Sequence, residues 1–221
     1  MSEVLEIKHS EQKIFPPMDY EEENFYPESH EGDMGEASIH YKLISYLFNS
    51  LELFFAKQSE VFVGANLNLY YKEKQPKRYY TPDVMIAFGV LNHNRKTYKL
   101  WEEKVFPQIV VEVASGTTWK IDISDKVADY ERLGAEEYYL LDPENAYLPL
   151  PLMAYRRDNF GRLRLVMTEE NRVLSALMNL EIVWTEGKFR LFDPNAQEFL
   201  MTTEEMKAEL DRLRAELKKR N

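Results

Sequence analysis

Two acidic residues occupy positions where a carboxylate is costly. Glu112 lies in the middle of the apolar run 109–114, and Asp83 opens the apolar run 83–90 directly after Pro82. A charged side chain inside a buried strand must be paired or must hold a metal ion, because desolvating it alone is strongly unfavourable. Glu112 is therefore the most informative residue of the chain.

Carboxylates on two neighbouring strands converge on one point and form an oxygen site suited to Mg²⁺, with Mn²⁺ as the alternative ion. Such an ion polarises a phosphoryl oxygen and lowers the pKa of a bound water. Phosphodiester hydrolysis then needs only a cation beside the attacking water. Lys126 is the candidate for that cation, because Asp122 and Lys126 are four residues apart and project from one face of a helix that follows Glu112.

Each of these residues also has a structural interpretation that involves no chemistry. Asp83 could begin a strand after a proline, and Glu112 could form a buried salt bridge to Lys126 or to an arginine. Lys126 taken alone could be a solvated helix residue. For Asp122 we favour a role as the N-cap of the helix, with a place in the active-site cleft as the alternative.

Further candidates flank this set. Glu36 could reach the metal from an earlier helix, although the capping box 33–36 also explains it. His40, on the same predicted helix, could line the cleft or be a structural histidine. A basic segment could grip a DNA backbone, or could discourage edge pairing between strands. It contains Lys72, Lys74, Lys77 and Arg78.

Other catalytic chemistries are excluded by residue content. The chain has no cysteine, which removes disulfides, zinc-thiolate sites, iron–sulfur clusters and cysteine nucleophiles. It contains no glycine-rich phosphate loop and no G-x-S-x-G motif, and its four histidines are not spaced as a metal-binding pair. Carboxylate chemistry remains.

The composition is that of a globular protein, with 44% hydrophobic and 30% charged residues. A length of 221 residues predicts one domain with tails. No apolar run approaches the roughly 18 residues needed to span a bilayer, and the acidic, polar start does not resemble a secretion leader. Together with the lack of cysteine, these features lead us to expect a cytoplasmic protein without a membrane partner.

The net charge of −10 is concentrated at the N-terminus. Residues 1–36 hold eleven acids against two lysines, a local charge of −9, so the remainder carries only −1. We expect residues 1–32 to form a solvated, poorly ordered arm. A nearly neutral body can still present a basic face, so the charge does not exclude DNA as a partner.

The patterns around the candidate residues predict the elements that position them. Periodic apolar residues predict a helix from Asp33 to about Lys57. Alternating or continuous apolar runs predict strands within 61–69, 83–90, 107–114 and 137–141. A helix over 122–133, closed by Gly134, is expected between the last two strands. The predicted order is helix, strand, strand, strand, helix, strand.

The C-terminal third carries two hairpin patterns and one helix pattern. Segments 153–157 and 162–167 flank a turn at 158–161, and segments 182–184 and 188–192 flank Glu186-Gly187. The last stretch has an apolar seam at spacings of four, three and four, formed by Met206, Leu210, Leu213 and Leu217. Because an isolated helix this short is marginal in water, we expect it to need a partner surface, and we favour a homodimer.

The chain resembles a known family at the residues singled out above. The resembling segments are 81–84, 110–115 and 137–143, together with Thr118, Asp122, Lys126 and Tyr130. They look like the Uma-two family of endonucleases, which belongs to the PD-(D/E)XK superfamily with the restriction-endonuclease-like fold. The resemblance spans roughly residues 30–200.

The resemblance implies that Asp83 and Glu112 match the metal-binding acids of the superfamily. The motif places a lysine two residues after the glutamate, and this chain has Ala114 there. The resemblance suggests that Lys126 substitutes for that lysine from the following helix. It also implies a nuclease activity that uses Mg²⁺ or Mn²⁺.

The expected fold class is α/β (α+β), with a restriction-endonuclease-like core. In it, a mixed β-sheet is flanked by helices and extended by C-terminal β-hairpins and a terminal helix. We expect an arm over residues 1–32, one endonuclease-like domain over 33–200 and a charged helix over 201–221. The expected function is metal-dependent hydrolysis of DNA. The alternatives are a binding or regulatory module of the same fold, which Ala114 favours, and a dimeric scaffold with purely structural acids.

Overall fold

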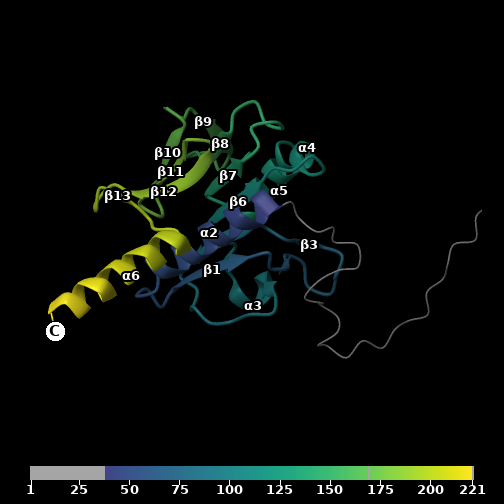
Figure 1. Cartoon of the computed structure of the whole chain (residues 1–221). Coiled ribbons are helices and arrows are strands. Elements are labelled where there is room, and N and C mark those ends of the chain that lie inside the picture. Colours follow the sequence, from purple (N-terminus) through teal and green to yellow (C-terminus); the bar gives the residue numbers. More distant parts are fainter. Residues whose placement is uncertain (1–37, 169, 221) are drawn as a thin grey trace, which may run out of the picture.

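The computed structural model describes residues 38–168 and 170–220. The predicted acidic arm, the predicted helix start at Asp33 and the candidate Glu36 lie outside the described residues. Figure 1 shows the arrangement of the elements, with helix α6 extending away from the body of the protein.

The helices and strands follow the predicted order and add several short elements. The helices are α2 (Ser38–Phe54), α3 (Leu100–Glu103), α4 (Trp119–Asp122), α5 (Asp125–Leu133) and α6 (Thr203–Arg220). The longer strands are β1 (Val61–Ala65), β4 (Val84–Phe88), β6 (Ile109–Val113), β7 (Glu137–Leu141), β8 (Leu152–Arg157), β9 (Leu163–Val166), β10 (Arg172–Ser175), β11 (Leu180–Thr185) and β12 (Lys188–Asp193). The two-residue strands are β2 (Leu69–Tyr70), β3 (Tyr79–Tyr80), β5 (Tyr98–Lys99) and β13 (Glu198–Phe199).

A six-stranded mixed sheet forms the centre, in the order β1-β4-β6-β7-β8-β9. Strands β6 and β7 run parallel, and the other neighbours in this sheet are antiparallel. The crossover between the two parallel strands contains α4 and α5. The predicted mixed sheet with flanking helices is therefore confirmed.

The two faces of this sheet carry different cores. Because side chains alternate along a strand, Val111 and Val113 face one side, where they pack with residues of α2 such as Leu47. Val110 and Ala114 face the other side, together with Tyr130 of α5. Glu112 shares the alternation of Val110 and Ala114, so it lies on the α5 face.

The C-terminal part adds a second sheet, in the order β10-β11-β12-β13. Its β11–β12 hairpin matches the second predicted hairpin, while the first predicted hairpin forms β8–β9 at the edge of the central sheet. A small third sheet, β3-β2-β5, lies between β1 and α3 in the sequence. Among the described helices, none combines the length and the hydropathy needed to cross a bilayer.

One predicted helix is divided into two. The segment expected to run from Asp122 to Leu133 breaks at Ile123-Ser124, and Ser124 precedes α5. Gly134 ends α5 at φ 109°, where its N–H bonds to the Tyr130 carbonyl, as predicted for a C-terminal glycine. The assignment of Asp122 as the helix N-cap is wrong. Asp122 is the last residue of α4, and burial directs its side chain to an ionic contact instead of a free backbone N–H.

Candidate active site

The register of β4 and β6 brings the two predicted acids to adjacent positions. Val84 lies opposite Val111 in this antiparallel pair. One residue further along, Asp83 therefore falls opposite Glu112. Directly opposed residues point to the same side of a sheet, with Cβ atoms about 5 Å apart. Both acids thus belong to the face covered by α5.

Asp83 is fixed by the main chain of the neighbouring strand. Its Oδ2 accepts a hydrogen bond of 2.6 Å from the backbone N–H of Val113. This contact ties the residue before β4 to the end of β6. It also orients the carboxylate beside Glu112, which immediately precedes Val113.

Glu112 lies in the core with only 2% of its surface exposed. Its Oε1 is 3.0 Å from the ammonium nitrogen of Lys126, which reaches it from α5. The same nitrogen is 2.8 Å from Oδ1 of Asp122, a residue with 0% exposure. The predicted proximity of Lys126 and Asp122, one helical turn apart, is observed across the junction between α4 and α5.

Two buried carboxylates share one ammonium in this cluster. Among the described residues, Lys126 is the ion-pair partner of both Glu112 and Asp122. Oδ2 of Asp122 is buried and has no hydrogen-bond partner within the described part of the chain. One ammonium therefore serves two buried carboxyl groups, which is a costly arrangement in a region of low dielectric.

The electrostatics follow from this arrangement. Burial raises the pKa of Glu112; Asp122 acts in the same direction, while Lys126 and Tyr130 act against them. Burial alone would lower the pKa of Lys126, but the carboxylates of Glu112 and Asp122 outweigh it and raise that pKa. Lys126 is therefore a permanent cation near neutral pH.

Tyr130 belongs to the site, although the sequence did not indicate its contact. Its hydroxyl donates a 2.6 Å hydrogen bond to Oε1 of Glu112. Burial followed by the charge of Glu112 raises the pKa of Tyr130 well above its ordinary value, which keeps the hydroxyl protonated and donating. The sequence pattern that could have indicated this contact is the spacing of Asp122, Lys126 and Tyr130, which recur every fourth residue.

The structure does not bring every candidate to this point. His40 lies in the first turns of α2, on the opposite side of the sheet from Glu112, and its Nε2 is 3.5 Å from Glu144. A cavity of about 550 Å³ lies nearby, between α2 and the β11–β12 hairpin, and is lined by residues such as Tyr46 and Lys188. Glu112 and Lys126 do not line this cavity.

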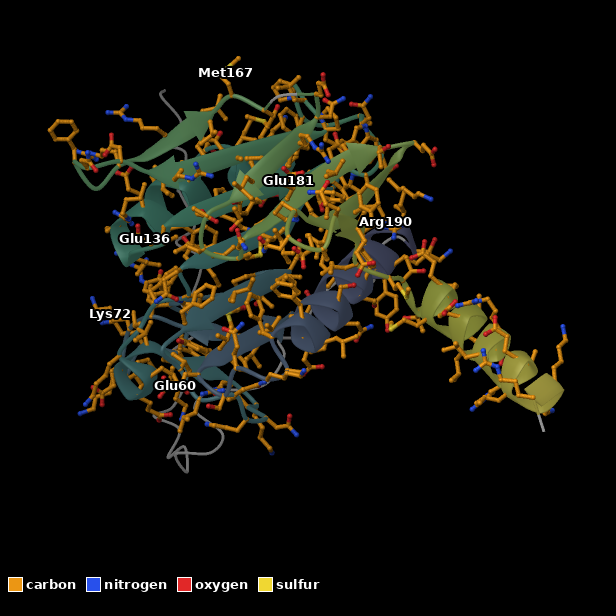
Figure 2. The ribbon with its side chains drawn as sticks, turned by 90° about the vertical axis from the view of Figure 1, so that its left-hand side faces the viewer. Glu60, Lys72, Glu136, Met167, Glu181 and Arg190 are labelled. Atoms are coloured by element: carbon orange, nitrogen blue, oxygen red, sulfur yellow. The ribbon has the colours of Figure 1, made fainter. Side chains whose placement is uncertain are left out.

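The predicted basic segment forms the exposed loop between β2 and β3. All four of its basic residues are exposed, and Figure 2 shows Lys72 at the surface. The base of the loop packs against α5, where the Tyr80 hydroxyl donates to Asp129 and Arg132 lies over the ring of Tyr71. Strand β3 then leads through Pro82 to Asp83. The basic loop is thus joined directly to the strand that presents one acid of the site.

Two other buried acids have structural partners. Glu137 lies on the α2 face, where the hydroxyls of Tyr139 and Ser175 donate to it and join the two large sheets. Asp142 accepts backbone hydrogen bonds from the loop after β7, including those of Ala146 and Leu148. Glu137 also lies 3.6 Å from the guanidinium of Arg156, so both acids have partners of their own within the fold.

The residues present can be compared with what a divalent metal ion requires. Among the described residues, no group of three or more histidine or acidic side chains is placed to hold a metal. Mg²⁺ commonly uses one or two carboxylates, and water or phosphate oxygens complete its shell. Asp83 and Glu112 are the two acids of the cluster that strand pairing places opposite each other, and they are the residues that would hold such an ion.

Comparisons with known proteins find a family match that spans the site. A sequence model of the Uma2 family, described as "Putative restriction endonuclease", matches residues 21–185. Four solved chains are similar, among them a "putative nuclease belonging to DUF820" from Anabaena variabilis. That match has 11% identity and a TM-score of 0.48, and it covers 66% of this chain and 76% of the other. No match is found among curated proteins. The family match includes the cluster around Lys126 and ends before α6.

Proposed function

The chain belongs to the Uma2 family of restriction-endonuclease-like proteins, and from this premise we propose that it is a metal-dependent endonuclease that hydrolyses phosphodiester bonds of DNA. The observation that carries the proposal is the opposition of Asp83 and Glu112 across β4 and β6, with Lys126 held 3.0 Å from Glu112. Paired carboxylates beside a fixed cation are the groups that metal-assisted phosphodiester hydrolysis requires.

In this proposal Asp83 and Glu112 hold Mg²⁺ or Mn²⁺. When bound, the ion supplies Lewis-acid polarisation of the phosphate and a more acidic water. Asp83 is oriented by the N–H of Val113, and Glu112 is oriented by the hydroxyl of Tyr130. Neither carboxylate then has to be reorganised for binding.

Lys126 acts as a fixed hydrogen-bond donor and not as a base. Its raised pKa keeps it protonated, and Asp122 holds it at 2.8 Å. From that position the ammonium orients the attacking water and stabilises the negative charge that develops on the phosphate. Asp122 is therefore a positioning residue for Lys126.

DNA is the proposed substrate because the basic loop lies beside α5. Exposed lysines and an arginine neutralise backbone phosphates and release counterions, which supplies sequence-independent affinity. The β2–β3 loop offers four such residues, Lys72, Lys74, Lys77 and Arg78.

A second candidate function rests on Ala114. This position, where the superfamily motif has lysine, is a fully buried core residue on the α5 face. If Lys126 cannot replace the missing lysine, the protein binds nucleic acid without cutting it. Such a module would retain the affinity of the basic loop and the ion pairs of Lys126.

A cleavage assay separates the two functions. Supercoiled and single-stranded DNA are incubated with Mg²⁺ or Mn²⁺ and with wild type, Asp83→Asn or Asp125→Asn. Asp125 is an exposed acid in the first turn of α5 and provides the matched control. We expect cleavage by wild type and by the control, and none by Asp83→Asn. Equal cleavage by all three would reveal a contaminating nuclease, and binding without cleavage by wild type would favour the second function.

A further inference from the structure

Helix α6 presents an apolar stripe that the described part of the chain leaves exposed. The helix has no buried residue and projects from the body, as Figures 1 and 2 both show. Its seam leucines are 47%, 44% and 61% exposed at Leu210, Leu213 and Leu217. With Met206 they follow the spacing of four, three and four that places side chains on one line of a coiled coil.

The charged residues beside this seam favour one orientation of a helix pair over the other. With Met206 and Leu213 at d positions and Leu210 at an a position, Glu209 takes position g and Arg214 takes position e. In a parallel pair of helices, g of one chain faces e of the next heptad in the other chain. Glu209 would then meet Arg214 of the second copy, twice by symmetry.

An antiparallel pair has the opposite electrostatics. Antiparallel helices bring g to g and e to e. That arrangement would place Glu209 against Glu216 and Lys207 against Arg214, so every close flanking pair would have like charges. The charge pattern is therefore self-complementary in the parallel orientation.

We propose that α6 pairs with α6 of a second copy of this chain as a parallel two-stranded coiled coil. The occupant of the seam is a second copy because Glu209 and Arg214 supply the charge complementarity on the same helix. Within one chain, Glu209 pairs with Arg212, and Arg214 lies 3.7 Å from Asp211. These exposed pairs contribute little stability, so exchanging them for pairs between chains has a small cost.

Hydrogen bonds at its N-terminus fix α6 to the body of the protein. Thr202 and Glu205 form a reciprocal capping box, in which each backbone N–H donates to the side chain of the other. Arg190 on β12 forms two hydrogen bonds with Glu205, and Figure 2 shows Arg190 next to the start of the helix. A helix anchored at its N-terminus requires less ordering on association than a free peptide of the same length.

Sedimentation equilibrium tests the association. We expect wild type to form a dimer at high micromolar concentration and Leu213→Glu to raise its dissociation constant by about a hundredfold or more, since two leucines per dimer lose burial. Ala215→Glu adds the same charge away from the seam and should leave the dimer unchanged. A monomeric wild type, or a dimer that Leu213→Glu leaves intact, would overturn the proposal.

Two further variants test the orientation. Glu209→Arg creates repulsion with Arg214 in a parallel dimer and should weaken it about three- to tenfold, whereas it creates attraction to Glu216 in an antiparallel dimer. The chain has no cysteine, so Met206→Cys provides a unique thiol. Parallel pairing brings the two thiols together and allows a disulfide, while antiparallel pairing separates them by about 16 Å. A stronger Glu209→Arg dimer, or no disulfide, would overturn the parallel arrangement. None of these measurements depends on nuclease activity.

Discussion

Replacing Lys126 by methionine removes the charge that two buried carboxylates share, at nearly constant side-chain volume. Glu112 and Asp122 lie 3.0 and 2.8 Å from the ammonium, and both are almost completely buried. Breaking a buried ion pair by removing one partner costs about 3 to 5 kcal/mol, because the remaining charge is uncompensated. We expect Lys126→Met to lower the free energy of unfolding by about 3 kcal/mol near pH 8.

The loss should depend on pH in a defined direction. Burial already raises the pKa of Glu112 above 4.5, and losing Lys126 raises it further. A carboxyl whose pKa is raised by folding binds more protons in the folded state, so its contribution to stability falls as pH rises from about 4.5 through the raised pKa. At low pH Glu112 is protonated and needs no cation. The deficit of Lys126→Met should therefore be smaller at pH 5 than at pH 8.

Urea unfolding from pH 5 to pH 8 measures this deficit. Lys120→Met is the control, since Lys120 is exposed on the neighbouring helix α4 and its loss should cost less than about 0.5 kcal/mol. In melting temperature, the expected deficit at pH 8 is about 6 to 12 °C for a chain of this size. If Lys126→Met and Lys120→Met unfold alike at every pH, or if the deficit grows as pH falls, the electrostatic account of the cluster is wrong.

Two other predictions address the metal and the DNA. Asp83→Asn keeps an oxygen that can accept the Val113 N–H but loses a charge opposite Glu112, so without metal it should melt at or above the wild-type temperature. Mg²⁺ at ~100 times its dissociation constant should stabilise the wild type by about 2.7 kcal/mol and should hardly affect the variant. The metal site would be refuted if the variant melted well below the wild type and neither protein responded to Mg²⁺. Replacing Lys72, Lys74, Lys77 and Arg78 by alanine should weaken DNA binding. The slope of the logarithm of the binding constant against the logarithm of the salt concentration should become shallower by about 0.9 for each phosphate that is no longer neutralised. An unchanged slope would mean that DNA binds elsewhere on the protein.

The clearest sequence patterns correctly predicted the strands that carry the candidate site residues. The apolar runs around Asp83 and Glu112 form β4 and β6, and the run 137–141 forms β7. A continuous apolar segment has to be buried in any fold of the chain, so its own pattern is enough to predict it. The two-residue strands β2, β3 and β5 were not predicted. An element that short has no periodicity, and it exists only where tertiary packing supplies a neighbour.

The sequence also predicted, on its own, that Glu112 needs a charged partner, and the structure places Lys126 beside it. A buried glutamate inside the run 109–114 is costly in any fold that buries the strand. The sequence alone therefore predicted that Glu112 is paired with a cation. The spacing of Asp122 and Lys126 likewise predicted their contact, although the two residues meet across the break between α4 and α5 and not along one continuous helix.

Only the tertiary structure decided which groups meet Glu112. The pairing of β4 with β6 placed Asp83 opposite it, and a shift of one residue would have sent Asp83 to the α2 face. The packing of α5 on the sheet brought the Tyr130 hydroxyl to Glu112 across 18 residues of sequence and buried Asp122, which local pattern had assigned to a cap. Such contacts depend on strand register and on the placement of a helix over a sheet. Both are set by interactions between distant segments, and no local sequence pattern encodes them.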